Sequence, residues 1–89
     1  MASPTLERMQ QDDLAMSVAR ALTIANEAAV AQGTDLSQSL ITITEEAPPP
    51  DSMWQVHYGP RDFRNRRGGD LIVVVNDRAG AVSRIVRGQ

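Results

Sequence analysis

The apolar residues of this chain change their spacing at Gly33, and this change restricts the fold more than any other feature of the sequence. Before Gly33 they recur every three or four residues, the spacing of one buried face on an α-helix. After Gly33 they alternate with polar residues or form short β-branched runs, which is typical of strands. The chain is therefore predicted to be one helix followed by a sheet. The apolar positions of the helical part are Leu14, Val18, Ala21, Leu22, Ala25, Ala28 and Ala29.

The helix is predicted to cover Leu14–Gln32, with Asp12 or Asp13 capping its start and Gly33 ending it in a left-handed turn. An earlier start at Pro4 is also open, because proline is favourable at the first helical position. Such a helix would be about 43 Å long, longer than so small a body can cover. We therefore expect an N-terminal segment, residues 1–11, that is flexible or extends the helix, before a single domain over residues 12–89.

Four segments after Gly33 have the composition of strands. In the second of them Trp54 and Val56 share one face with Tyr58, and His57 lies on the other. The third is apolar on both faces, which predicts a central strand. The turn before the fourth, residues 76–80, ends in glycine, as hairpin turns often do. The predicted strands are Leu40–Thr44, Met53–Tyr58, Leu71–Val75 and Ala81–Arg87.

These elements predict the α+β class: one long N-terminal helix packed across a four-stranded antiparallel meander. A chain of 89 residues suffices for one such core layer. The helix would cover one face of the sheet and leave the other in water. The facing side chains are predicted to be Leu14, Val18, Leu22 and Ala25 on the helix, and Trp54, Val56, Val73 and Val75 on the sheet.

The sequence offers no set of residues that is typical of catalysis, so we expect a protein that is not an enzyme and uses no metal or cofactor. It contains no cysteine and a single histidine, His57, which is a general base or, in the simpler interpretation, a strand residue. Glu45 and Glu46 are adjacent, and adjacent strand residues point to opposite faces. Residues 1–11 do not have the pattern of a signal peptide, and the longest apolar runs are short for a membrane span, which predicts a cytoplasmic protein with no membrane partner.

Charge divides the chain into two poles. Residues 1–59 hold eight acids and two arginines, a net charge of −6, whereas residues 60–89 hold seven arginines and three acids, a net charge of +4. The basic pole includes a long loop with four arginines and one aromatic ring, and such residues are common where proteins bind each other. A solvated loop with Phe63 folded into the core is the alternative. The predicted partner-binding residues are Arg61, Phe63, Arg64, Arg66 and Arg67.

Nucleic acid is not the partner that this interpretation favours, because the chain as a whole is acidic, with a pI near 5.2. The acids form two groups, one around Glu45 and Asp51 and one around Asp12. The second group is explained by helix capping or forms an acidic surface for a basic partner. A homodimer through the helix or the N-terminal segment is also expected, because several apolar residues lie off the main stripe: Leu6, Met9, Met16, Ile24 and Val30.

The second half of the chain carries a pattern of structural residues that includes Trp54-x-Val56-x-Tyr58, Gly68-Gly69, Val73-Val74-Val75 and Asp77-x-x-Gly80. With the terminal Arg87-Gly88-Gln89, it resembles small bacterial immunity proteins with an NTF2-like or cystatin-like fold. The helix with Ala25 and Ala28 followed by a strand also resembles the PepSY domain. The likeness covers residues 14–89.

The first resemblance implies a non-catalytic module that neutralises a toxin made by the same cell. The second implies a module that restrains a peptidase outside the membrane, and the absence of a signal peptide favours the first. A nucleic-acid-binding module that uses the Arg61–Arg67 loop is the remaining alternative. No binding residue carries over from either family, so the arginine loop is predicted from its composition alone.

Overall fold

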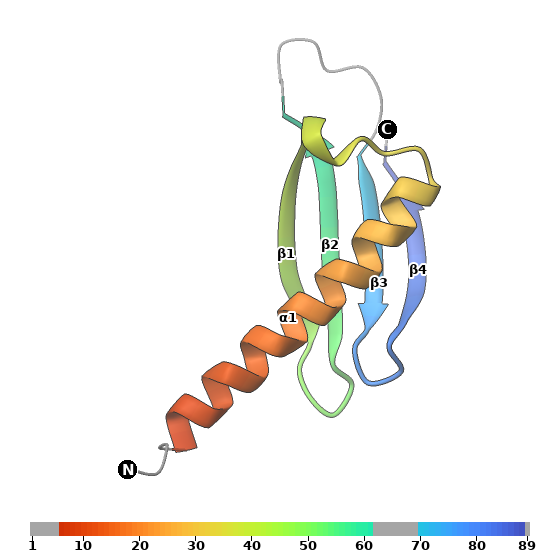
Figure 1. Ribbon diagram of the computed structural model, residues 1–89. Helices are drawn as coiled ribbons and strands as arrows, with labels where there is room; N and C mark the ends of the chain where they lie inside the picture. Colours follow the sequence, from red (N-terminus) through yellow and green to blue (C-terminus); the bar gives the residue numbers. More distant parts are fainter. Residues whose placement is uncertain (1–5, 62–69, 89) are drawn as a thin grey trace.

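A long helix lies diagonally across one face of an antiparallel sheet (Figure 1). This is a computed structural model that describes residues 6–61 and 70–88, with side chains from Asp12 onward. The helix is α1 (Leu6–Ala31), and each strand pairs with the next in chain order. The predicted fold class, one N-terminal helix packed on a four-stranded antiparallel meander, is confirmed. The strands are β1 (Ser39–Ala47), β2 (Met53–Pro60), β3 (Leu71–Asn76) and β4 (Ala81–Arg87).

The two ends of α1 differ in how well the sequence predicts them. At the C-terminus Gly33 has φ 90°, its N–H donates to the Val30 carbonyl, and the Thr34 N–H donates to the Ala29 carbonyl. This pair of bonds is the Schellman motif, which satisfies the last carbonyls, and it confirms the predicted stop. At the N-terminus the helix begins at Leu6, so the prediction of a start capped by Asp12 or Asp13 is wrong. Both aspartates lie inside the helix.

The core is built from small residues on α1 and large ones on the sheet. Ala21, Ala25 and Ala29 are completely buried, and their spacing of four lets the helix axis come close to the strands. The predicted contact of Leu14 is wrong, because half of its surface is exposed; Ile24, predicted to lie off the stripe, packs against the core. Their sheet partners are Trp54, Val56, Tyr58, Leu71, Val73 and Val75.

No described helix covers the other face of the sheet, yet Val74 on that face is completely buried. Its cross-strand partner on β4 is Arg84, whose Nη2 lies 2.7 Å from Oε1 of Glu46 on β1. The two long side chains therefore meet across the face from opposite edge strands, and their apolar stems shield the strands between them. This explains why the third strand can be apolar on both faces, as predicted, without a second helix.

Between α1 and β1 lies a short 3-10 helix, η1 (Leu36–Gln38), that the periodicity does not predict. Asp35 caps it: one carboxylate oxygen accepts from the backbone N–H of Ser37 at 3.0 Å and from its hydroxyl at 2.7 Å. The hydroxyl bond, followed by the backbone bond, lowers the pKa of Asp35. The cap turns the chain from the end of the helix into the first strand.

The stretch Asp12–Ala31 of α1 is long and apolar enough to cross a membrane by length and composition, with a mean hydropathy of 1.2. A core helix and a signal sequence near the N-terminus meet the same criterion. In this structure the alanine stripe of the stretch packs on β2 and β3, although only 17% of the stretch is buried.

Candidate functional site

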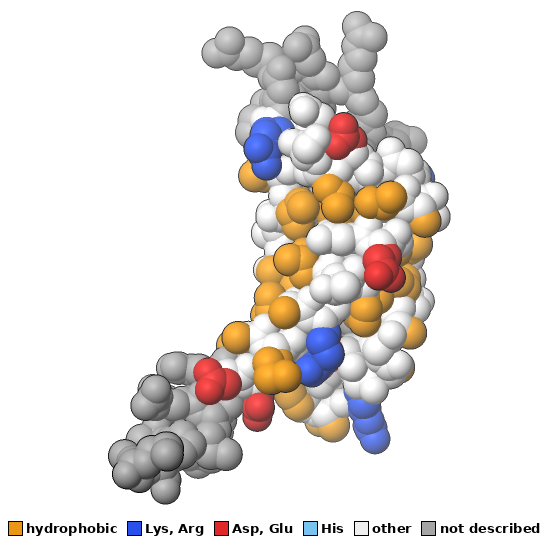
Figure 2. Space-filling model, viewed as in Figure 1, with side chains coloured by type: hydrophobic (Ala, Val, Ile, Leu, Met, Phe, Trp, Pro, Cys, Tyr) orange, Lys and Arg blue, Asp and Glu red, His pale blue; other side chains and the backbone are white. Residues whose placement is uncertain are grey.

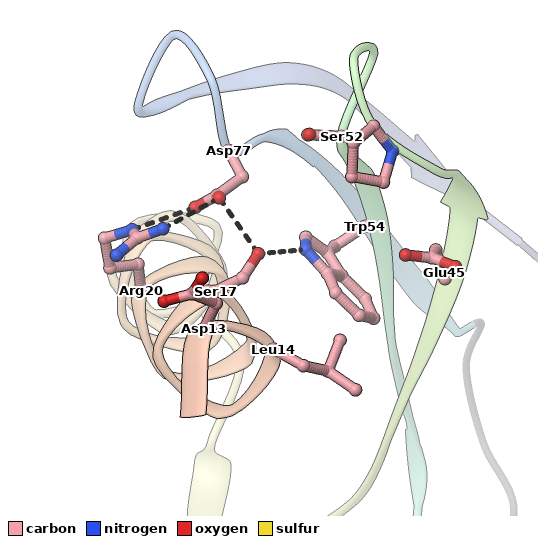
Figure 3. A pocket seen from close by; sticks show the side chains of 9 residues that line it. Asp13, Leu14, Ser17, Arg20, Glu45, Ser52, Trp54 and Asp77 are labelled. Carbon is pink, nitrogen blue, oxygen red and sulfur yellow. Dashed lines mark hydrogen bonds and ion pairs between the residues drawn. The ribbon is translucent and has the colours of Figure 1, made fainter. Parts of the chain in front are cut away.

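A hollow of about 480 Å³ lies where α1 crosses the end of the sheet that carries the two hairpin loops, between the helix and these loops (Figure 3). The helix contributes Asp13, Leu14, Ser17 and Arg20 to its wall. The sheet side contributes Glu45 from β1, Trp54 from β2, and Asp77 just after β3, with Pro49 and Ser52 from the loop between β1 and β2. Hydrophobic side chains continue from here along α1 over the face of the body (Figure 2).

A hydrogen-bond network forms the floor of the hollow. The indole N–H of Trp54 donates to the Ser17 hydroxyl at 2.8 Å, and that hydroxyl donates to Oδ2 of Asp77 at 2.9 Å. Arg20 donates to both carboxylate oxygens of Asp77, at 3.1 Å from Nε and 3.0 Å from Nη2. The dashed lines of Figure 3 follow this path. The network joins the helix to β2 and to the turn after β3.

Local structure explains why these groups meet. Ser17 and Arg20 are three residues apart on α1, so their side chains lie on the same side of the helix. Asp77 is held at the start of its turn because its N–H donates to the Ser52 carbonyl at 2.9 Å, which ties the two hairpin loops together. Trp54 opposes Val75 across the β2–β3 pair, which directs its ring toward the helix.

Asp77 carries a negative charge that its neighbours neutralise. The hydrogen bonds from Arg20 lower the pKa of Asp77 despite the opposing effect of burial, and Ser17 lowers it further. The pKa of Arg20 is raised in turn, chiefly by its hydrogen bond to Asp77. Asp13 and Glu45 differ, because within the described part of the chain neither makes a hydrogen bond or ion pair. The lining therefore keeps two carboxylates without a hydrogen-bond or ion-pair partner in that part of the chain, although the charge of Asp13 also contributes to the raised pKa of Arg20.

The arrangement suits binding better than bond cleavage. A serine nucleophile needs a base within hydrogen-bond reach, and Ser17 gives its proton to a carboxylate that Arg20 already holds. His57 lies on the opposite face of the sheet, where its Nε2 is 2.7 Å from Oδ2 of Asp70. The hollow combines apolar walls from Leu14, Pro49 and Trp54 with carboxylates, which suits a cation on an apolar stem.

The arginine loop is only partly described. Arg61 follows β2; its N–H donates to the Gln38 carbonyl at 3.1 Å, and its Nη2 lies 3.4 Å from the Ser39 carbonyl oxygen. Phe63, Arg64, Arg66 and Arg67 lie outside the described residues, so their predicted role in partner binding stays a prediction.

Sequence reasoning missed the hollow, although it named some of the hollow's residues. The sequence predicts Trp54 as core, Asp13 as a helix cap and Asp77 as part of a turn, and none of these predictions places the three residues around one hollow. Ser17 and Arg20 carry no signal, because a polar residue on a helix is ordinarily solvated. Only the angle at which α1 crosses the sheet brings residues 17 and 77 together.

Comparison with protein-family models, with curated proteins and with solved structures gives no match for this chain. The chain is therefore assigned at the level that its structure shows: a small α+β domain with one N-terminal helix packed on a four-stranded antiparallel sheet.

Proposed function

We propose that this chain is a protein-binding module without catalytic activity, and that its hollow receives a lysine or arginine side chain of the partner. The observation that carries the proposal is the pairing of apolar walls with two carboxylates that have no hydrogen-bond or ion-pair partner among the described residues, Asp13 and Glu45. A long basic side chain has the matching form, because its methylene stem packs on apolar surface while its charged head meets the acids.

A protein side chain fits the hollow better than a free metabolite does. Sites for small molecules usually fix their ligand with several polar groups that are aimed into the pocket. Here the Ser17 hydroxyl, the Trp54 N–H and the Asp77 carboxylate are bonded to one another or to Arg20. The hollow thus selects one charge on an apolar stem, and the rest of the affinity must come from the surface around it, as at an interface.

For the partner's identity we propose a toxin made by the same cell, with the chain as its immunity protein. The resemblance of residues 14–89 to small bacterial immunity proteins supports this choice, and the acidic hollow adds a preference for a basic surface on the toxin. A peptidase restrained by a PepSY-like module is the other partner class that the resemblance supports. Nucleic acid is less well supported, because Arg20 and Arg84 are each paired with a carboxylate.

The test compares two neighbouring aspartates. Asp13 lines the hollow and Asp12 does not, while both are exposed helix residues of equal charge. The wild-type chain, Asp13→Lys and Asp12→Lys are immobilised and exposed to extract of the native cell, and the captured protein is identified and quantified. We expect Asp13→Lys to lose the partner and Asp12→Lys to retain it. Equal capture by both variants would contradict the proposed site.

A third variant, with Arg64, Arg66 and Arg67 replaced by alanine, separates the hollow from the arginine loop. Loss of capture in this variant alone would move the site to the loop, and a captured nucleic acid that is released by salt would replace the protein partner. Absence of catalysis is tested by a hydrolase and nuclease screen. Turnover that disappears in His57→Ala would refute the non-catalytic part of the proposal.

A further inference from the structure

The helix is longer than the sheet that it covers. At 1.5 Å per residue its 26 residues span about 39 Å. It packs chiefly on β3, β2 and β4, and its N-terminal half passes the lower end of β1 and projects beyond that edge (Figure 1). Side chains from Asp12 to Met16 are all exposed, and Leu14 and Met16 are 50% and 60% exposed. A projecting helix with apolar side chains is marginal in water without something to pack on.

Among the described residues, no strand pairs with the outer edge of β1 beneath this projection. β1 is the first strand of the sheet, and its pairing with β2 runs without interruption from Ser39 to Glu45. On the helix side of β1, Ile41 is 37% exposed, because α1 crosses the strand at its other end, near Glu45. Edge strands of this length are usually protected by charges, prolines or bulges, and the run from Ser39 to Thr44 has none of these.

We infer that two copies of this chain associate through β1, edge to edge and antiparallel, with the projecting half of each α1 lying over the other copy's sheet. A two-fold axis at Thr42 sets Ile41 of one copy opposite Ile43 of the other, so that the helix sides of both edge strands form one apolar row. The same rotation brings each projecting helix over the Ser39–Ile41 end of the second copy. In each copy, the Ser39–Ile41 end of β1 is the part that the helix of the same copy does not cover.

Charge complementarity identifies the occupant as a second copy. The axis at Thr42 places Glu45 of one copy opposite Ser39 of the other. The Arg61 guanidinium lies at the Ser39 carbonyl, at 3.4 Å, so Glu45 meets Arg61 of the second copy, and symmetry repeats the pair at the other end. The acidic and basic poles of the chain thus meet. Glu45 is then shared between this contact and the hollow, and Asp13 remains the carboxylate that is open to another protein.

The other edge strand is less suited to pairing. β4 carries Arg84 and Arg87, and its pairing with β3 shifts register in the middle of the strand, between Val74 and Val75, whereas the charges and the register shift of β1 begin only near its end, from Glu45 on. A bulge and charges are the features that keep edges apart. This difference supplies a matched control, because Ile85 on β4 also lies on the helix side and is 38% exposed, close to the 37% of Ile41.

The experiment measures the mass of the purified chain by light scattering during size exclusion, in the absence of any partner. We expect twice the 9.7 kDa of one chain. Ile41→Lys should weaken the association about tenfold or more, because the lysine would face Ile43 of the second copy, whereas Ile85→Lys should leave it unchanged. A wild-type monomer at high micromolar concentration, or dissociation by Ile85→Lys alone, overturns the inference.

A cross-link tests the register even where Ile41→Lys fails to fold. The chain has no cysteine, so Thr42→Cys provides a single thiol. Directly opposed strand residues have Cα atoms about 4.5–5.5 Å apart, within the span of a disulfide. We expect Thr42→Cys to form a covalent dimer on mild oxidation and Ser83→Cys, on β4, to stay monomeric. The reverse result, or no cross-link in either, excludes β1 pairing. The inference can fail while the hollow still binds its partner, because the two assays share no readout.

Discussion

Replacing Trp54 tests the packing on which the fold and the hollow both depend. The ring is 7% exposed and packs between α1 and β3, and its N–H is bonded to Ser17. Trp54→Ala should lower the free energy of unfolding by about 3–5 kcal/mol, the usual cost of deleting a buried aromatic ring. A chain of 89 residues has a total stability of about 4–13 kcal/mol, so the variant should be marginal or unfolded.

Trp54→Phe separates the two contributions of this residue. It keeps a buried ring but leaves the Ser17 hydroxyl without its donor, so we expect a smaller loss of about 1–3 kcal/mol. Urea unfolding followed by far-ultraviolet circular dichroism measures both variants, because the chain has no other tryptophan to report by fluorescence. A loss below about 1 kcal/mol for Trp54→Ala would refute the buried position of the ring.

Three further predictions concern single groups. Burial raises the pKa of Tyr58 to about 12, so the midpoint of its absorbance titration, which no other tyrosine obscures, should lie above the ordinary value. Because Tyr58 ionises first in the unfolded chain, the stability of the fold should decline as the pH rises from about 10 to about 12. Asp77→Asn should destabilise the chain at neutral pH, because the partners that lower the pKa of Asp77 stabilise its ionised form in the folded chain. The difference in stability from wild type should shrink as the pH falls below the ordinary aspartate pKa, and a difference independent of pH would contradict this. Gly33→Ala should lower the free energy of unfolding by about 1–2 kcal/mol, because φ at this position is 90°, a conformation that alanine disfavours even though no atom crowds its Cβ. Thermal or urea unfolding measures this, and an unchanged stability would contradict it.

The sequence predicts those features that depend on neighbours along the chain. Gly33 ends the helix as expected, the fourth strand has the predicted bounds, and Trp54, Val56 and Tyr58 share the buried face. Periods of 3.6 and 2 are local properties, and turn glycines act on their own backbone. The class of fold follows from such features because few arrangements bury one helical stripe against one sheet.

The features that the sequence does not predict depend on how elements far apart in the chain meet in space. Leu14 continues the apolar stripe, yet it reaches the end of the sheet and stays half exposed, while Ile24 packs on the core although it lies off the stripe. Val74, buried on the other face, is paired with Arg84, whose salt bridge to Glu46 joins strands that are not neighbours. The bond from Ser17 to Asp77 joins residues 60 positions apart, and no spacing in the sequence indicates it.

Hydrogen–deuterium exchange of the chain, with and without the protein captured from the native cell, tests the proposed function most directly. The proposal predicts slower exchange in the complex for the amides that surround the hollow, in residues 12–20, around Ser52 and in the turn after Asp77. It predicts little change in exchange for the amides of β4, the edge strand opposite β1. Slower exchange confined to residues 61–67, with no change around the hollow, would contradict the claim that the hollow receives the partner.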